Sequence, residues 1–315
     1  MYAKERDFIQ MKKRLSWILL VSQLAFVCLM LISCQKDADT ITKVTGPIID
    51  SVESEDGVMI HYEVVGEGEP ALVFVHGWNC DRGYWKDQVG EFSKTYQVVT
   101  VDLGGHGESG LGREDWTMAA FGADVASVVN KVNPNKVVLI GHSLGGKVSL
   151  EAARQLSGRI IGVIGVDCFK EFGTGYSPEQ VTEMAKPFRA DFAASVDGFI
   201  RGMFPKDADS ALVNWVVADM SAAPQEVAMS AFENYFRTDV QAILRDVRVP
   251  IRAINSDMTP TAIENNRKYA SSFEMKSVTG IGHFIPQESP ATFNRLLHET
   301  LDELTGKSGA SVEEK

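Results

Sequence analysis

The chain has 315 residues, of which 44% are hydrophobic and 23% charged, proportions that are ordinary for a globular protein with a large core. Its formal net charge is -11, which argues against nucleic acid as a partner and against general attraction to anionic membrane surfaces. Any membrane association therefore has to come from one particular segment.

The N-terminus predicts an export signal rather than a part of the fold. Lys12, Lys13 and Arg14 precede an apolar run from Leu15 to Ile32, and a basic segment before an apolar run is typical of a secretory signal. An uncleaved signal anchor is the alternative, because the run is nearly long enough to span a bilayer.

The apolar run ends in Leu31-Ile32-Ser33-Cys34, which resembles the lipobox of bacterial lipoproteins. The resemblance implies that residues 1–33 are a cleaved signal peptide and that Cys34 is lipidated. The exported protein would then be anchored to a membrane, at the outer membrane or the periplasmic face, and Gln35 resembles the residue of lipoproteins sent to the outer membrane. Residues 34–50 are interpreted as a tether, before one domain over residues 51–305.

The first part of the domain predicts two strands, a helix and a third strand. Val58–Val65 and the all-apolar Ala71–Val75 are the first two, with Gly66–Pro70 as the turn of a hairpin between them. A helix around Trp85–Phe92 and a strand, Gln97–Val101, follow.

The next segment, Leu103–Arg113, is rich in glycine and must be a loop. Its glycine spacing is not that of a dinucleotide fingerprint, and it has no P-loop lysine. We therefore expect no nucleotide site here, and we expect no cofactor and no metal ion for the protein.

After a helix over Ala119–Val132, the apolar run Val137–Ile140 is typical of a strand buried on both faces of a parallel sheet. It leads into a G-x-S-x-G, Gly141–Gly145, and then into apolar residues at helical spacing. Strand, sharp turn and helix is the context in which this pattern exposes a strained serine. Side chains at the two glycines would collide with neighbouring backbone. Ser143 is therefore the predicted nucleophile.

Alternating strands and helices predict a mostly parallel sheet with helices on both faces. Ile160–Val166 is a further buried strand, but residues from about 169 to 246 predict only helical segments, broken at Pro187, Pro205 and Pro224. We interpret this stretch as a helical lid inserted in the domain. The elements predicted after it are a strand (Pro250–Asn255), a helix (Ala262–Ala270), a strand (Phe273–Thr279), a final helix with an apolar stripe (Phe293, Leu296, Leu297, Leu301, Leu304) and a disordered tail (306–315).

The lid is dense in aromatic side chains, most of which we expect to pack the lid helices together. A few should face Ser143 and line an apolar pocket. The candidates are Phe169, Phe172, Tyr176, Phe188, Phe192, Phe199, Phe204, Trp215, Tyr235 and Phe236. Cys80 and Cys168 are predicted to be free thiols, with a disulfide as the alternative.

Four segments together look like the motif set of the α/β-hydrolase superfamily. They are His76-Gly77-Trp78, Asp102–Ser109, Gly141–Gly145 and Gly282-His283-Phe284, in this order. The resemblance covers roughly Val58 to Leu304. It implies an α/β-hydrolase fold, which is a mostly parallel central sheet with helices on both faces and a helical lid.

The family order places the nucleophile first, then an acid, then a histidine. Only His283 and His298 follow Ser143. His298 belongs to the final helix, whereas His283 follows the last strand directly. His283 is therefore the predicted base, which takes the Ser143 proton and returns it to the leaving group.

The acid should lie at the end of a strand on the same edge of the sheet, where it fixes the imidazole tautomer. Asp257 follows the strand Pro250–Asn255 and is the predicted acid. Asp167, at the end of the preceding strand, is the competitor, because some family members place the acid there. Asp246 lies before its strand, at the wrong edge.

Two backbone donors are needed for the negative charge that develops in acyl transfer. One is the amide of Leu144, which follows the nucleophile, and by family pattern the other is the amide of Trp78. The resemblance also implies that Asp102 anchors the glycine-rich loop, and His76 is expected to brace its loop rather than to react.

The expected function is a serine hydrolase that cleaves a small acyl substrate, above all a carboxylic ester, through an acyl-enzyme. Ser143 sets the chain apart from the epoxide hydrolases and haloalkane dehalogenases of this fold, which use an aspartate. Thioesterase, lactonase, carbon–carbon hydrolase and cofactor-free perhydrolase activities stay open, because all use the same triad. The alternative from another class is a lipoprotein that binds a ligand with little turnover.

Overall fold

The computed structural model describes residues 46–306. The predicted signal peptide, the lipidation site Cys34, most of the tether and the tail from residue 307 lie outside the described residues. Within 46–306, no helix has the length and apolar character needed to cross a membrane.

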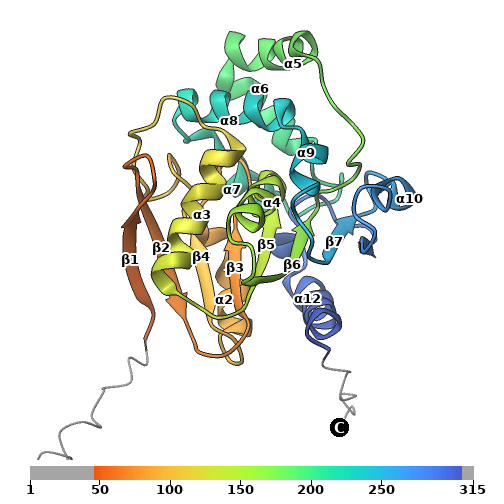
Figure 1. The fold of residues 1–315 in the computed structure, drawn as a ribbon. Coiled ribbons are helices and arrows are strands. Elements are labelled where there is room, and N and C mark those ends of the chain that lie inside the picture. The colour runs from red at the N-terminus through yellow and green to blue at the C-terminus, as the bar shows by residue number, and fades with distance from the viewer. Residues whose placement is uncertain (1–45, 307–315) are drawn as a thin grey trace, which may run out of the picture. The chain divides into compact units, whose positions relative to one another are not determined.

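One sheet of eight strands forms the centre of the domain, in the spatial order β1-β2-β4-β3-β5-β6-β7-β8 (Figure 1). β2 pairs antiparallel with β1 and with β4, and all other neighbours pair parallel. The strands are β1 (Ile48–Glu53), β2 (Met59–Val65), β3 (Ala71–Val75), β4 (Val98–Val101), β5 (Val137–His142), β6 (Ile160–Val166), β7 (Ile251–Ser256) and β8 (Glu274–Val278). The predicted α/β-hydrolase fold, with its mostly parallel sheet, is confirmed.

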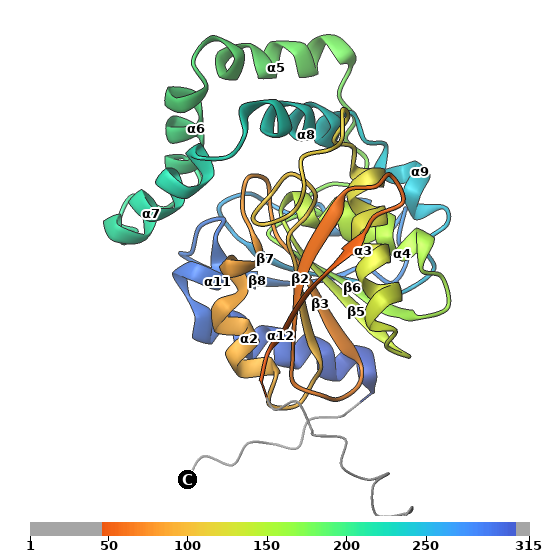
Figure 2. The ribbon, with the colours of Figure 1, turned by 90° about the vertical axis from the view of Figure 1, so that its left-hand side faces the viewer.

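Helices cover both faces of this sheet, so that every residue of β3 and β5 is buried. α3 and α4 lie on one face, and α2, α11 and α12 lie on the other (Figure 2). The helices are η1 (Arg82–Trp85), α2 (Lys86–Phe92), α3 (Met118–Val132), α4 (Leu144–Gln155), α5 (Pro178–Ala190), α6 (Phe192–Arg201), α7 (Ser210–Ser221), α8 (Gln225–Arg237), α9 (Val240–Leu244), α10 (Ile263–Asn266), α11 (Ile285–Glu288) and α12 (Pro290–Thr305).

Two predictions for the first strands were wrong. A strand, β1, begins at Ile48 inside the predicted tether, and its mostly exposed face left no apolar pattern to reveal it. Gly66–Pro70 does not close a hairpin between β2 and β3, because β4 lies between them, antiparallel to β2 and parallel to β3.

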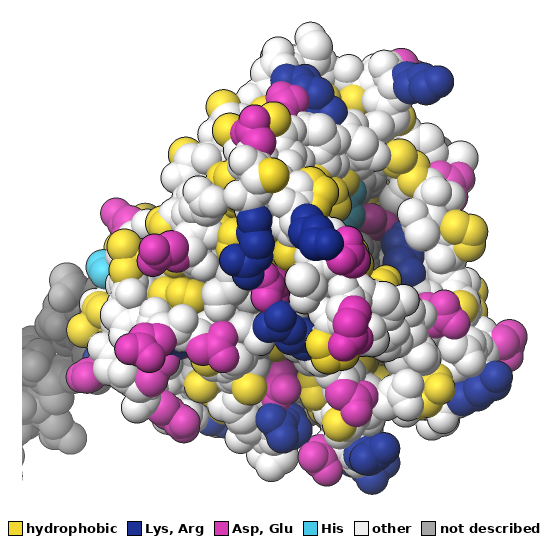
Figure 3. Space-filling view, turned by 90° about the horizontal axis from the view of Figure 1, so that it is seen from above, with side chains coloured by type: hydrophobic (Ala, Val, Ile, Leu, Met, Phe, Trp, Pro, Cys, Tyr) yellow, Lys and Arg dark blue, Asp and Glu magenta, His cyan; other side chains and the backbone are white. Residues whose placement is uncertain are grey.

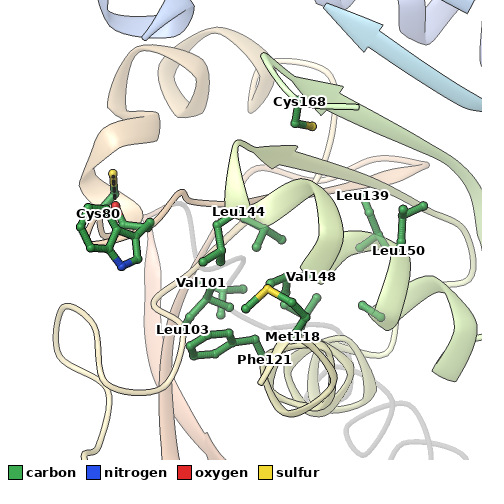
Figure 4. Close-up of a cluster of buried hydrophobic side chains, with 14 of the residues drawn as sticks. Cys80, Val101, Leu103, Met118, Phe121, Leu139, Leu144, Val148, Leu150 and Cys168 are labelled. Atoms are coloured by element: carbon green, nitrogen blue, oxygen red, sulfur yellow. Dashed lines mark hydrogen bonds between the residues drawn. The ribbon is translucent and has the colours of Figure 1, made fainter. Parts of the chain in front are cut away.

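The core between the sheet and its α3/α4 face fixes the position of α4. Figure 4 shows Val101 from β4 near Phe121 of α3 and Leu144 of α4, and Leu139 from β5 near Leu150 of α4. All of these side chains are at most 2% exposed. The start of α4 is therefore packed into the core beside the sheet. Cys80 and Cys168 are buried free thiols that lie apart in this view, as predicted.

The lid consists of α5 to α9, between β6 and β7, and in Figure 2 α5, α6, α7 and α8 arch over the end of the sheet. As predicted, this part of the described chain contains no strand. The predicted break at Pro187 was wrong, because Pro187 lies in the last turn of α5, which ends at Ala190. A proline this near the end removes only a single hydrogen bond from the helix.

Candidate active site

Ser143 lies at the junction of β5 and α4, with the strained backbone angles φ 52° and ψ -115°. A Cβ on Gly141 would lie 2.1 Å from the carbonyl oxygen of Gly145, and a Cβ on Gly145 would lie 2.4 Å from that of Val75. Both glycines are therefore required by close backbone approach, for the reason inferred from the sequence. The turn holds Ser143 at the carboxyl edge of the sheet, under the lid.

His283 lies in the loop between β8 and α11, and its ring is fixed by Asp167. Nδ1 of His283 donates to Oδ2 of Asp167 at 2.6 Å. The other carboxylate oxygen, Oδ1, accepts from the backbone amide of Ser256 at 2.8 Å and from Nζ of Lys170 at 2.8 Å. With Nδ1 carrying a proton, Nε2 of His283 is left free to accept one.

The structure therefore corrects the assignment of the acid, since Asp257 does not contact the imidazole. Asp257 is exposed, and its Oδ1 accepts from the backbone amide of Gly280 at 3.3 Å. The reason lies in the strand order: β6, which ends just before Asp167, is the neighbour of β5, whereas β7 is one strand further from Ser143. The competitor, Asp167, is the carboxylate that contacts the imidazole of His283.

The Asp167 side chain is only 9% exposed, and burial alone would raise its pKa. The hydrogen bond and charge of His283, followed by the charge of Lys170, outweigh burial, so that the pKa of the Asp167 carboxyl lies below its ordinary value. Asp167 is therefore a carboxylate at neutral pH, as a group that orients and stabilises an imidazolium has to be.

Two further histidines, His142 and His76, form hydrogen bonds that brace the loops of the site. His142 donates from Nε2 to the carbonyl oxygen of His283 at 3.0 Å. Burial, with a contribution from His283, lowers the pKa of His142 to about 3, so its ring is neutral. His76 accepts from the amide of Leu103 at 3.0 Å and donates to the carbonyl of Gly77, which is the bracing role expected of it.

Asp102 holds the start of the glycine-rich loop, as the resemblance implied. Its side chain is fully buried and accepts from the backbone amides of Arg82 at 2.7 Å and Glu108 at 3.0 Å. The Arg82 guanidinium pairs with it as well. These bonds leave no role for Asp102 in the chemistry at Ser143.

Trp78 and Leu144, the predicted oxyanion donors, both line the same cavity as Ser143. Leu144 is the first residue of α4, so its N–H has no partner inside the helix. Within residues 46–306 no hydrogen bond occupies either backbone amide. The Trp78 ring nitrogen donates to the carbonyl of Ala228 in α8 at 2.8 Å, which ties this loop to the lid.

The cavity measures about 60 Å³ and is almost wholly apolar. Its lining consists of Gly77, Trp78, Cys80, His142, Ser143, Leu144, Phe199, Met203, Met220, Phe232, Tyr235, Phe236, His283 and Phe284. Of the lid aromatics predicted from the sequence, Phe199, Tyr235 and Phe236 line it. Phe232 was missed, although its place four residues before Phe236 on one helix face was a usable signal.

The molecular surface around the cavity carries charges of both signs. Seen from above, lysine, arginine and acidic side chains are scattered, and a histidine is visible in a shaded hollow (Figure 3). Within residues 46–306, no group of three or more His, Cys, Asp or Glu side chains is arranged to hold a metal ion.

Comparison with known proteins places the chain in one family. Residues 72–296 match the model of the alpha/beta hydrolase family. The chain is 22% identical over 204 residues to the karrikin insensitive 2 receptor CA of Petunia hybrida, covering 62% of this chain and 76% of the receptor. It is 28% identical over 204 residues to a pimeloyl-[acyl-carrier protein] methyl ester esterase of Methylococcus capsulatus, covering 61% and 77%.

Among solved structures, a thermophilic esterase from Thermogutta terrifontis superposes with a TM-score of 0.70. It is 23% identical in sequence, and the match covers 82% of this chain and 99% of the esterase. At this identity the likeness concerns the fold.

Proposed function

Because this chain belongs to the alpha/beta hydrolase family, we propose that it is a serine hydrolase that cleaves a small, uncharged acyl substrate, with a carboxylic ester as the preferred class. The observation that carries the proposal is the common cavity of Ser143 and His283, with the imidazole held by Asp167. The esterase from Methylococcus capsulatus supports the reaction class by its name.

In the proposed mechanism, Nε2 of His283 takes the proton of Ser143 as the hydroxyl oxygen attacks the carbonyl carbon of the substrate. The tetrahedral oxyanion accepts hydrogen bonds from the amides of Trp78 and Leu144. Imidazolium returns the proton to the leaving alcohol, and the acyl group stays on Ser143. Water activated by the same histidine then releases the acid and restores the serine. Asp167 keeps its charge throughout.

The cavity supports a small acyl group. A volume of about 60 Å³ is well below the 300–1,000 Å³ of drug-sized ligand sites and leaves room for only a few carbon atoms. Aromatic walls from Trp78, Phe199 and Phe232 favour groups that lose their hydration at low cost. Triglycerides and peptides do not fit this space while the lid keeps its position.

Other chemistries of the same triad stay open, namely those of a thioesterase, a lactonase, a carbon–carbon hydrolase or a cofactor-free perhydrolase. A second candidate function is ligand binding with little turnover, which the receptor from Petunia hybrida suggests by its name. The proposal further includes export and anchoring through a lipid on Cys34, which would place the enzyme at the outer membrane or the periplasmic face.

Labelling with a fluorophosphonate probe separates enzyme from binder. We expect the wild-type chain to be labelled and Ser143→Ala to remain unlabelled, because the probe needs an activated serine. A panel of esters, thioesters and lactones of graded acyl length should then favour short, uncharged acyl groups. Faster cleavage of long-chain triglycerides would contradict the capped cavity, and failure of both labelling and turnover would favour the binder.

A further inference from the structure

The loop around the proposed base is held at three consecutive backbone amides. Gly282 donates to Oε2 of Glu288 at 2.9 Å, and Phe284 donates to Oε1 of the same carboxylate at 3.1 Å. Between them, His283 donates to the carbonyl oxygen of Met203 in the lid at 2.9 Å. One side chain therefore brackets the histidine from both sides, and the lid contacts it in the middle.

The loop is closely packed against its neighbours on both sides of His283. A Cβ on Gly282 would lie 2.5 Å from the carbonyl oxygen of Met203 and 2.7 Å from Oε1 of Glu288. The ring of Phe204, next to Met203, stacks on Phe284 at a centroid distance of 5.0 Å. The lid and the carboxylate thus both contact the loop around His283, and together they leave no space for a side chain at Gly282.

Capping of α11 accounts for only part of this geometry. Glu288 is the last residue of this short helix, and a bond from its carboxylate back to the amide of Phe284 satisfies a free N–H at the helix start. The second bond, to Gly282, lies beyond the helix on the other side of the histidine. Capping of α11 does not require the bond to Gly282, but a support that holds the loop on both sides of His283 does require it.

The environment of the Glu288 carboxylate also argues against a role in fold stability alone. Burial raises the pKa of Glu288, and the two amide bonds oppose this only in part. Within residues 46–306 no lysine or arginine forms an ion pair with Glu288. A partly buried carboxylate without a cation partner is costly. Such residues are expected where a site has to be held in one geometry.

We propose that Glu288 is a positioning residue for the catalytic base, holding the loop on both sides of His283 so that the imidazole lies between Asp167 and Ser143. The inference rests on the proposed function, since it assigns Glu288 a task in that reaction. Glu288 touches neither the substrate cavity nor the reacting atoms, and it acts only through the backbone of the loop. The lid contacts the same loop separately, through the bond from the His283 amide to the carbonyl oxygen of Met203.

The test compares Glu288→Gln with the wild type in the full chain. Glutamine keeps the shape but has one acceptor oxygen, so one of the two amides faces an NH2 group. We expect kcat for a short ester to fall about 10- to 100-fold while KM stays within about twofold, because displacement of a catalytic group affects the chemical step. The control is Glu299→Gln, which removes an exposed carboxylate of α12 and should leave kcat unchanged.

A spectroscopic measurement isolates positioning from general stability. The proton between Nδ1 of His283 and Asp167 should give a far-downfield NMR resonance in the wild type, because this bond is short and charge-assisted. In Glu288→Gln we expect the resonance to shift upfield or to broaden. An unchanged kcat and an unchanged resonance in a folded variant would overturn the proposal.

A second variant covers the case in which Glu288→Gln does not fold. Glu288→Asp keeps the charge but is one methylene shorter, so it reaches only one of the two amides, and its kcat should lie clearly below that of the wild type. Wild-type kcat in this variant would overturn the proposal. Ser143→Ala gives the reference for the function itself: if it turns over ester as fast as the wild type, the proposed function fails, whatever Glu288 does.

Discussion

Asp167 combines a strained backbone with three contacts of its carboxylate. It follows β6 with a positive φ of 43°, a conformation that a non-glycine residue adopts only when its surroundings hold it there. Its carboxylate bonds to His283, Lys170 and the backbone of Ser256 at once. The strained backbone and the bonds at both carboxylate oxygens fit the proposed task of Asp167, which is to orient the imidazole.

The assignment of the acid predicts a large difference between two aspartates. Asp167→Asn should lower kcat by about 10⁴-fold, because the amide favours the wrong imidazole tautomer and cannot stabilise imidazolium. Asp257→Asn should change kcat by less than about threefold, since it loses only a long bond to Gly280 at the protein surface. The measurement is kcat for a short ester, with circular dichroism to verify folding. Comparable losses in both variants would contradict the assignment.

At the scale of elements, α4 links the nucleophile to the lid. Ser143 precedes this helix, and one turn later Nζ of Lys147 donates to the carbonyl oxygen of Tyr235 at 2.7 Å and lies 4.0 Å from the centre of its ring. Tyr235 lies in the last turn of α8, where a cation is favourable, and it lines the cavity. Lys147 therefore holds a wall of the cavity in place.

This contact predicts a specific dependence of stability on pH. Burial lowers the pKa of Lys147 from 10.5 to about 8, so between these values the unfolded chain binds a proton that the folded chain does not. The free energy of unfolding then gains a term that rises with pH from about 8 to 10. Lys147→Met should lack this term.

Urea unfolding of both proteins at several pH values between 7 and 10 provides the check. The difference between wild type and Lys147→Met reports on the lysine together with its electrostatic coupling to Cys168. The exposed Lys136→Met is the matched control and should follow the wild type. A difference between wild type and Lys147→Met that stays constant over this range would rule out the lowered pKa of Lys147.

The lid residues that line the cavity are predicted to affect substrate binding without affecting the reactivity of Ser143. Phe199 on α6 lines the cavity yet is 37% exposed, so a glutamate there can be tolerated by the fold. Phe199→Glu should raise KM for short esters at least about tenfold, because a charge next to the substrate opposes its desolvation. Labelling of Ser143 by a small fluorophosphonate should persist. Tyr176→Glu, at an equally exposed lid position outside the cavity lining, should leave KM near the wild-type value.

In the whole domain, the first described strand begins on the side of the sheet where the parallel strands start, which is opposite the site. Ile48 pairs with Val64, next to Val65, which pairs with Val98 at the start of β4. Ser143 follows the last residue of β5, at the opposite ends of the parallel strands. The lid helices arch over this side of the sheet (Figure 2). A segment attached before Ile48 therefore joins the domain at the edge away from the lid.

The proposed anchor makes a prediction for the intact protein. Expressed in its host, the chain should be recovered with membranes, its mature form should begin at Cys34, and Cys34→Ala should abolish lipid attachment. The measurements are fractionation and mass determination of the mature N-terminus. Esterase activity of Cys34→Ala should equal that of the wild type, since the substitution lies outside the domain. Retention of residues before Cys34 would instead establish a signal anchor.

The sequence by itself determined the features that depend on local chemistry. The strained turn at Ser143 follows from glycines that no other residue can replace, and the loop at His283 follows from its place directly after the last strand. The helical character of the lid and the buried strands β3 and β5 follow from hydrophobic periodicity, which a short window of residues already contains.

Only the tertiary structure decided the features that depend on strand order and side-chain direction. Asp167 and His283 are 116 positions apart, and both candidate acids follow strands that end at the same edge. The pairing of β6 with β5 alone brings one of them to the imidazole. The insertion of β4 and the bracket that Glu288 forms are likewise contacts made through space. Local sequence patterns carry no record of such contacts, because they form when distant segments pack together.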